Sequence, residues 1–364
     1  MTAPDKLSIL NEVLARCRNA PFYRHRVPRR ALSSMEELRQ IPVTTKEELR
    51  QASPYGLICV PRQELYQYHE SFGTTGAPVS TWLTGEDLRA SARLINRCGI
   101  EFSKYDTVLV RFPYAISSAA HLVHAAARLK RACVIPVSSR SAISPFPRVV
   151  DMLKRLEVTI LACLPLQALL LAETAEMLGW RPDRDFPRLR AIFTAGEPLT
   201  PGRRNLLEEI WGVPVFNHYG MAEIGAAMSD CEFGRFHPPE DYFVIELLTE
   251  DLKNEARPGE PGHLVVTTLK KKAAPVIRFL TGDRAVKIQR DCPCGQEYHL
   301  EIRGRVENGI PMDGRVIDLW HLDEVVSHLP CRRYWVAGPD AGKIRIVVEE
   351  EKAGQGVKPH TIRY

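Results

Sequence analysis

The spacing of apolar positions changes along the chain, and each spacing indicates a different kind of structure. In residues 6–18 apolar positions recur at helical spacing, which predicts an N-terminal helix with one apolar face. Residues 44–48, TTKEE, have the hydroxyl-to-carboxylate order of a capping box, so a second helix is expected to begin there.

From about Val108 onward, short apolar runs alternate with helical stretches. The runs that read as buried strands are residues 107–110, 133–137, 159–164, 191–193 and 213–216. The helical stretches between and after them are residues 119–129, 149–156, 168–178 and 203–210. Buried strands followed by helices are typical of a parallel sheet with helices on its faces, so we expect an α/β fold.

The pattern beyond Cys231 is rich in strands separated by turn signals. The expected strands are residues 243–247, 262–267, 276–279 and 286–288. After Arg305 we expect one helix over residues 322–329 and strands over 334–336 and 343–348. Because 364 residues exceed the usual single compact core, we expect two or three cooperating units.

Composition narrows the functional class. The net charge is only +5, and the basic residues form short dispersed groups, which argues against a nucleic-acid partner. A mild positive field suits an anionic substrate such as a nucleoside triphosphate. Residues 1–10 lack the apolar region of a secretory signal, and no apolar run approaches ~18 residues, so no membrane span is expected. The nine scattered cysteines indicate a reducing cytoplasm.

The sharpest chemical signal is residues 71–78, SFGTTGAP. Its two glycines let the backbone fold tightly around an anion, and its three hydroxyls can donate to phosphate oxygens. The loop is not a Walker A motif, because it lacks the final Gly-Lys-Ser/Thr. Taken alone, it is equally well read as a plain turn.

Three later motifs extend this signal in a fixed order. The loop resembles the triphosphate-gripping loop of the adenylate-forming superfamily of acyl-CoA synthetases, peptide-synthetase adenylation domains and luciferases. Residues 217–223, NHYGMAE, resemble its adenine and magnesium motif, residues 281–283, TGD, its ribose motif, and residues 303–305, RGR, its approach to the hinge. The order of these motifs is far more specific than any of them alone.

Within the superfamily the chain is most similar to the phenylacetate–CoA ligase branch. Residues 21–24, PFYR, residues 195–198, AGEP, and residues 292–295, CPCG, carry that likeness, which extends from about residue 10 to residue 326. The resemblance implies ATP-dependent activation of an aromatic carboxylic acid to an acyl-adenylate, followed by thioester formation with CoA. It also suggests a homodimer. The resemblance further implies a large adenylation core over residues 1–305, β-rich and zinc-bearing from about 231, and a shortened α+β lobe over residues 306–364.

The resemblance assigns roles to particular residues. It implies catalytic roles for Glu223, which would hold Mg²⁺, and for Thr74, Thr75 and Arg305. The implied ATP- or AMP-binding residues are Ser71, Gly73, Thr74, Thr75, Gly76, Ala195, Gly196, Glu197, Pro198, Asn217, His218, Tyr219, Gly220, Met221, Glu223, Asp283 and Arg305. The implied acyl pocket comprises Phe112, Tyr114, Phe193, Ala195, His218 and Tyr219. We expect His121 and His124 to have core or capping roles rather than ligand contacts.

A second constellation has the composition of a metal site. Cys231, His237, Cys292 and Cys294 supply three thiolates and an imidazole, which is a complete tetrahedral zinc shell. Such a closed shell would make the zinc structural rather than catalytic. The substitute ligand is His299 if His237 is not used, and the alternative is that these are ordinary loop residues.

Two departures from the family weaken the catalytic interpretation. Ala222 stands where the family has a threonine or serine that contacts the α-phosphate, which would cost roughly 1–2 kcal/mol. The lobe after Arg305 is short, and Lys343, Lys352 and Lys358 do not fit the family's lysine motif. Two rival hypotheses therefore remain: a nucleotide- or acyl-adenylate-binding homologue with weak turnover, and an enzyme that transfers its acyl group to a carrier protein.

Overall fold

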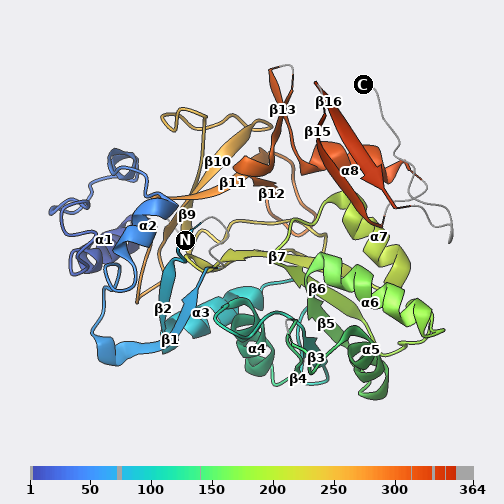
Figure 1. The fold of residues 1–364 in the computed structure, drawn as a ribbon. Coiled ribbons are helices and arrows are strands. Elements are labelled where there is room, and N and C mark those ends of the chain that lie inside the picture. The colour runs from blue at the N-terminus through green and yellow to red at the C-terminus, as the bar shows by residue number, and fades with distance from the viewer. Residues whose placement is uncertain are drawn as a thin grey trace.

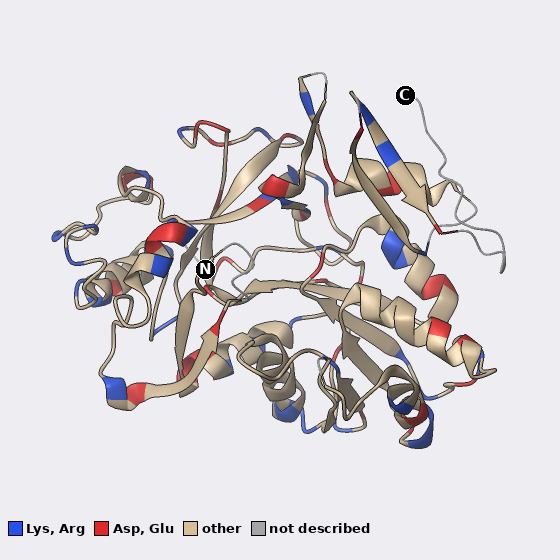
Figure 2. Cartoon of the chain, in the orientation of Figure 1, with Lys and Arg blue, Asp and Glu red and all other residues tan. Residues whose placement is uncertain are grey.

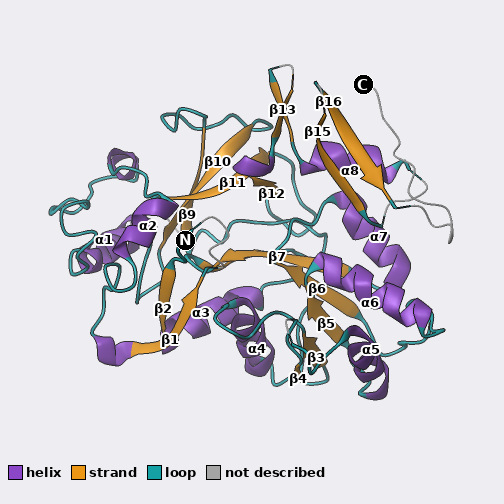
Figure 3. Ribbon diagram, viewed as in Figure 1, coloured by secondary structure: helices purple, strands orange, loops and turns teal. Residues whose placement is uncertain are grey.

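The computed structural model describes residues 3–71, 76–139, 141–312, 314–329, 333–340 and 342–349. Figure 1 shows a large sheet in the lower half, a second sheet above it, and a small lobe at the upper right that contains the last described strands. Figure 3 shows helices gathered around the lower sheet, and strands dominating the upper part.

The large sheet has six strands in the order β4-β3-β5-β6-β7-β8, parallel from β4 to β7. Its strands are β3 (Thr107–Val110), β4 (Cys133–Pro136), β5 (Ile160–Cys163), β6 (Ala191–Ala195), β7 (Val215–Met221) and β8 (Gly225–Ser229). Every apolar run predicted as a buried strand in this region forms one, so the expected α/β fold is confirmed. Strand β8, which pairs antiparallel with β7, was not predicted, because its small residues lack the β-branched pattern of a strand.

Alternate residues of these strands enter two separate cores. Val108 and Val110 join the core shared with α3 (Gly85–Ile95) and α4 (Ala119–Leu129), whereas Leu109 faces the other side. That side is covered by helices α5 (Phe146–Arg155), α6 (Pro165–Met177) and α7 (Pro201–Trp211). The period of two along a strand therefore places helices on both faces of the sheet.

The second sheet is antiparallel, in the order β12-β11-β10-β9. Its strands are β9 (Phe243–Leu248), β10 (Pro261–Thr268), β11 (Phe279–Ile288) and β12 (His299–Arg305). The prediction of separate strands over 276–279 and 286–288 is wrong, because one strand, β11, runs from Phe279 to Ile288. Gly282 has a positive φ of 80° within β11, and this bulge-like kink hides the continuity in the sequence pattern.

The N-terminal part packs against this sheet. Its elements are helix α1 (Ala3–Cys17), the 3-10 turns Glu36–Gln40 and Arg62–Glu64, helix α2 (Lys46–Ala52), and the antiparallel strands β1 (Leu65–Glu70) and β2 (Ser80–Thr84). The capping box is present: the Thr45 hydroxyl accepts from the Glu48 backbone N–H, and the Glu48 side chain accepts from the Thr45 N–H.

The residues after Arg305 form a lobe with a small core of its own. Its elements are the 3-10 turn Val306–Asn308, strands β13 (Ile310–Met312) and β14 (Arg315–Ile317), helix α8 (Leu319–Ser327), and strands β15 (Trp335–Asp340) and β16 (Lys343–Val348). The lobe rests against α6 and α7: Arg203 Nη1 donates to the Arg333 carbonyl at 2.5 Å, and Tyr334 Oη donates to Glu173 at 3.0 Å.

Basic and acidic side chains are interspersed along the ribbon (Figure 2). Among the helices of the described residues, none is both long and apolar enough to cross a lipid bilayer.

Candidate functional site

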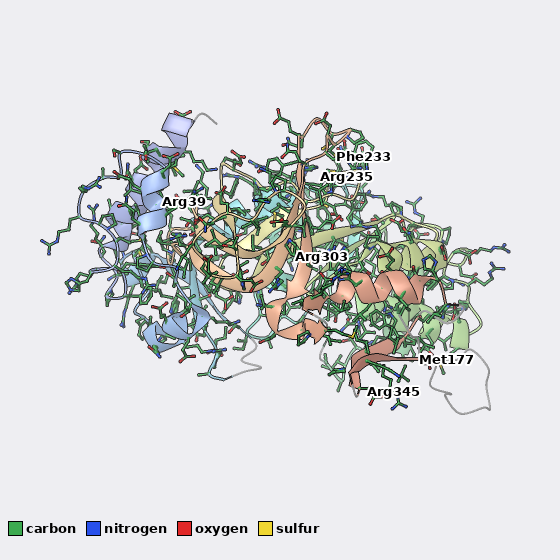
Figure 4. All side chains as sticks on the ribbon, turned by 90° about the horizontal axis from the view of Figure 1, so that it is seen from above. Arg39, Met177, Phe233, Arg235, Arg303 and Arg345 are labelled. Atoms are coloured by element: carbon green, nitrogen blue, oxygen red, sulfur yellow. The ribbon has the colours of Figure 1, made fainter. Side chains whose placement is uncertain are left out.

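A pocket of about 540 Å³ lies where the carboxyl ends of β6 and β7 meet β11 and β12. The predicted nucleotide-binding residues that line it are Gly196, Glu197, Pro198, Asn217, His218, Tyr219, Gly220, Met221, Asp283 and Arg305. Asn308 and Trp320 of the C-terminal lobe, and Phe233 and Arg235 on a rim loop labelled in Figure 4, also line it. Ligands of open α/β sheets bind at this edge, beyond the carboxyl ends of the strands.

Tyr219, Asp283 and Arg305 form a connected group on the pocket wall. Tyr219 Oη donates to Asp283 Oδ2 at 2.6 Å, and Arg305 Nε lies 3.2 Å from Asp283 Oδ1. The register of β11 and β12 causes this contact, because Asp283 stands opposite Arg305. Burial raises the pKa of Asp283, whereas the charge of Arg305 and the hydroxyl of Tyr219 lower it. The group presents carboxylate oxygens beside an aromatic ring, which suits a ribose next to an adenine.

The turn after β6 forms another part of the pocket lining. Gly196 has a φ of +82°, and a Cβ there would lie 2.9 Å from Leu164 Cδ2, so glycine is required at this position. Glu197 Oε2 accepts from the Leu166 N–H at 3.1 Å, and burial raises the pKa of Glu197. Ala195 is buried at the end of β6 and does not belong to the pocket lining.

His218 and Asn217 of β7 are held in place by contacts with Ser229, Phe193 and Asp230. His218 Nδ1 lies 2.8 Å from Ser229 Oγ, and its ring stacks on Phe193 with 5.8 Å between centroids. Burial lowers the pKa of His218 to about 3, so the imidazole is neutral at physiological pH. The Asn217 N–H donates to Asp230 at 2.6 Å. These contacts fix the β7 backbone at the pocket.

Glu223, in the turn between β7 and β8, lies outside the residues that line this pocket. Its side chain is buried, and Lys46 Nζ lies 3.3 Å from its Oε1. Apart from this ion pair with Lys46, that oxygen has no hydrogen-bond partner among the described residues, so it retains a lone pair for a cation. Because Mg²⁺ keeps several waters and phosphate oxygens, one carboxylate of this kind suits its preferred coordination.

Two lysines next to Glu223 were not predicted from the sequence. Besides Lys46, the buried Lys271 donates from Nζ to the Glu223 carbonyl at 2.5 Å, and burial lowers the pKa of Lys271 to about 8. In the sequence Lys271 is the middle residue of a short basic run, residues 270–272. Only the tertiary structure distinguishes it, because burial of one lysine in such a run leaves no mark in the composition.

The loop predicted to grip phosphate is described only at its ends. Phe72, Gly73, Thr74 and Thr75 lie outside the described residues. Ser71 Oγ accepts from the Val79 N–H at 2.9 Å, and the Ser71 N–H donates to the Val79 carbonyl at 3.0 Å. These bonds close the base of the loop. Gly76 has a φ of +149°, a conformation that favours glycine.

The predicted acyl-pocket residues do not all meet at one surface. His218 and Tyr219 line the pocket, whereas Phe112 and Phe193 are fully buried and absent from its lining. Tyr114 is half-buried near α4, where its hydroxyl lies 3.3 Å from His124 Nδ1. Because the predicted residues do not share one surface, the acyl pocket stays a prediction.

The four predicted zinc ligands come together from two loops. The ligand atoms of Cys231, His237, Cys292 and Cys294 all lie within 4.8 Å of one another. The sulfurs of Cys231 and Cys292 are 3.8 Å apart, which matches the edge of about 3.8 Å that tetrahedral Zn–S bonds of about 2.3 Å give. His237 Nδ1 lies 2.7 Å from the Tyr298 carbonyl, so the ring donates there and turns Nε2 toward the sulfurs. His299, the substitute ligand considered from the sequence, lines the pocket of about 540 Å³ instead.

Comparisons with known proteins identify the family to which this chain is similar. A family model described as AMP-binding enzyme matches residues 71–269. A phenylacetate-coenzyme A ligase of Thermus thermophilus is 31% identical over 323 residues, covering 85% of this chain and 71% of its own length. One of Pseudomonas putida is 31% identical over 278 residues, covering 73% of this chain and 62% of its own length.

A solved structure shares the fold. A 2-hydroxyisobutyryl-CoA ligase in the postadenylation state, in complex with R3-HIB-AMP, aligns with a TM-score of 0.86 and 24% identity. The alignment covers 95% of this chain and 77% of that structure's chain.

Proposed function

Since the chain belongs to the AMP-binding enzyme family, as an adenylate-forming acid–thiol ligase, we propose that it activates an aromatic carboxylic acid with ATP and passes the acyl-adenylate to CoA. The observation that carries the proposal is the group of Tyr219, Asp283 and Arg305 in a pocket large enough for a nucleotide. The aromatic acid is the class named for the relatives that it resembles.

In the first half-reaction a carboxylate oxygen of the acid attacks the α-phosphorus of ATP, and pyrophosphate leaves. The acid is already ionised at neutral pH, so positioning and neutralisation of charge suffice and no general base is needed. Tyr219 and Asp283 would hold the nucleoside, with Arg305 fixing the carboxylate of Asp283. Mg²⁺, held by Glu223, would neutralise the triphosphate.

Lys46 offers a further positive charge on the same side. Its ammonium lies beside Glu223, and its charge lowers the pKa of Asp283, so it acts on both ends of the proposed nucleotide site. We propose that Lys46 neutralises part of the negative charge that develops on the phosphates during adenylation. Positive charge placed where the transferring group develops negative charge accelerates such reactions.

We propose the same division of the chain as the sequence suggests. Residues 1–305 would form the adenylation core, with the zinc-bearing part over 231–305, and residues 306–364 the lobe that covers the pocket. Trp320 and Asn308 support this proposal, because both line the pocket from the lobe. In the zinc-bearing part, the closed ligand set implies a structural ion that joins two loops.

The test is ATP-dependent pyrophosphate release with a panel of aryl acids, each with and without CoA. We expect release to require the acid and to be stimulated by CoA. Stimulation by a holo-carrier protein but not by CoA would favour carrier transfer. No release with any acid, while AMP still binds, would favour the weak-turnover homologue and reject the proposal.

A further inference from the structure

A cluster of polar side chains lies between β1 and α4, apart from the residues that line the nucleotide pocket. Gln67 and His69 of β1 face His121 of α4: Gln67 Nε2 is 3.0 Å from His121 Nδ1, and the rings of His69 and His121 are 5.2 Å apart. Gln67 and His69 are two residues apart on a strand, so they share one face. The Tyr114 ring is 5.3 Å from that of His121.

The hydrogen bonds determine which atoms of the cluster still need a partner. His121 Nε2 lies 2.9 Å from the Tyr114 carbonyl and must donate to it, so His121 Nδ1 accepts from the Gln67 amide. His69 Nδ1 lies 3.0 Å from the Ile116 carbonyl and must also donate. His69 Nε2 is therefore a hydrogen-bond acceptor.

Two buried acceptors in the cluster lack a donor. Both His69 Nε2 and Gln67 Oε1 are buried, and no described residue donates a hydrogen bond to either. The His69 side chain as a whole is only 2% exposed, and burial lowers its pKa, so it remains a neutral acceptor. Buried acceptors without donors are costly, so acceptors of this kind are expected to receive a donor from an ordered water or from a bound molecule.

The backbone next to the cluster is strained. Ile116 is β-branched, yet its φ is +63°, a region that such residues rarely adopt. In this conformation its carbonyl accepts from both His69 Nδ1 and the Glu70 N–H, at 3.0 and 3.1 Å. The hydrogen bond to this carbonyl holds the His69 ring in one orientation, and backbone strain of this kind is concentrated at ligand sites.

The cluster adjoins the residues proposed to surround the reacting phosphate. His69 precedes Ser71, the first residue of the phosphate loop, by two positions, and Lys271, which binds the Glu223 carbonyl, is close enough to act electrostatically on His69. Tyr114, a residue of the expected acyl pocket, packs against His121 with 5.3 Å between ring centroids, so the cluster also adjoins that part of the chain.

We propose that His69 and Gln67 determine substrate specificity by accepting hydrogen bonds from the acid. The substrate class is then an aromatic carboxylic acid that carries a hydrogen-bond donor on its ring, namely a hydroxyl or an amino group. This inference rests on the proposed function and narrows its substrate. Recognition by a buried acceptor discriminates strongly, because an analogue without the donor leaves the acceptor unpaired.

The experiment compares ring-hydroxylated or ring-aminated benzoic and phenylacetic acids with matched acids that carry fluorine or hydrogen at the same position. The readout is kcat/KM for ATP-dependent pyrophosphate release. Two variants remove one acceptor each: His69→Asn, whose amide can still donate to the Ile116 carbonyl, and Gln67→Met, which keeps the side-chain length. Tyr66→Phe is the matched control, because Tyr66 directly precedes Gln67 on β1 and is 69% exposed.

For the unmodified chain we expect the donor-bearing acid of at least one matched pair to be preferred by about 10- to 100-fold. Each acceptor variant should reduce that preference to a few-fold while Tyr66→Phe retains it, and thermal unfolding would show that the variants are folded. Release without any preference for donors, or a preference that survives in folded acceptor variants, would overturn the inference and assign the two acceptors to buried water. No release with any acid would instead reject the proposed function.

Discussion

The hydrogen bond between Tyr219 and Asp283 offers the most direct test of the nucleotide site. Tyr219→Phe removes only the hydroxyl, which donates to Asp283 Oδ2 at 2.6 Å, and keeps the ring on which adenine would stack. Asp283 is 5% exposed, so water cannot readily replace the lost donor. Its carboxylate would then be held by Arg305, at 3.2 Å from the other oxygen.

The expected magnitude follows from the type of bond. A hydrogen bond to a charged group contributes about 1.5–3 kcal/mol, and a buried acceptor that loses its donor costs a similar amount. For a chain of this length we therefore expect the melting temperature to fall by about 2–4 °C. We also expect the Kd for AMP to rise about tenfold, because the carboxylate proposed to receive the ribose hydroxyls would no longer be held in one orientation.

Differential scanning fluorimetry with and without AMP, together with calorimetric titration of AMP, would measure both effects. Tyr105→Phe is the matched control, since Tyr105 is 80% exposed and distant in sequence from every pocket residue. If Tyr219→Phe matched this control in both melting temperature and AMP affinity, the assignment of Tyr219 and Asp283 to the nucleotide site would be refuted.

Four further results are expected. Removing metal with a strong chelator should lower the melting temperature and release about one zinc per chain, measured by metal analysis, and Cys294→Ser should have the same two effects. A chain that is isolated without zinc, and whose melting temperature does not change with chelator, would contradict the zinc site. The pKa of His218 in the folded chain is lowered from 6.5 to about 3, so its contribution to stability is present above pH 6.5 and is lost as the pH falls toward 3. Over that range the unfolding free energy should therefore fall more steeply than in His218→Asn, by up to about 1.4 kcal/mol per pH unit. Parallel profiles of the two proteins would exclude a buried neutral imidazole. Lys46→Gln should reduce kcat/KM for pyrophosphate release about tenfold or more, and an unchanged rate would leave Lys46 only a structural partner of Glu223. Ala222→Thr should raise the adenylation rate up to about tenfold by restoring a phosphate contact, which unchanged kinetics would refute.

The hydrophobic pattern alone identified much of the fold. The apolar runs at β3, β4, β5, β6 and β7 predicted buried parallel strands, because strands covered on both faces are apolar at every position. The same pattern is missing at β8, where small residues pack under α3, and at β11, where Gly282 interrupts one continuous strand. In both places packing partners, rather than local preference, determine the strand.

Sequence also supplied most of the residues of the candidate site, through ordered motifs. It could not supply Lys46 and Lys271, because nothing local distinguishes a lysine at a helix start or in a lysine run from a solvated one. Both become part of the site through contacts with Glu223, which is 48 residues from Lys271 along the chain. The open acceptors of His69 and Gln67 could not be predicted either, since only the complete set of hydrogen bonds shows which atoms lack a donor.

The sequence by itself therefore determined the strand and helix periodicity, the family motifs and the choice of three cysteines and one histidine as predicted zinc ligands. The tertiary structure decided the pairing of Asp283 with Arg305, the closure of the ligand cluster, and the burial that makes His218 neutral. The physical reason is the distance along the chain over which each effect acts. Periodicity and turn preference act over a few residues, whereas register, desolvation and ion pairing depend on neighbours that only the folded chain brings together.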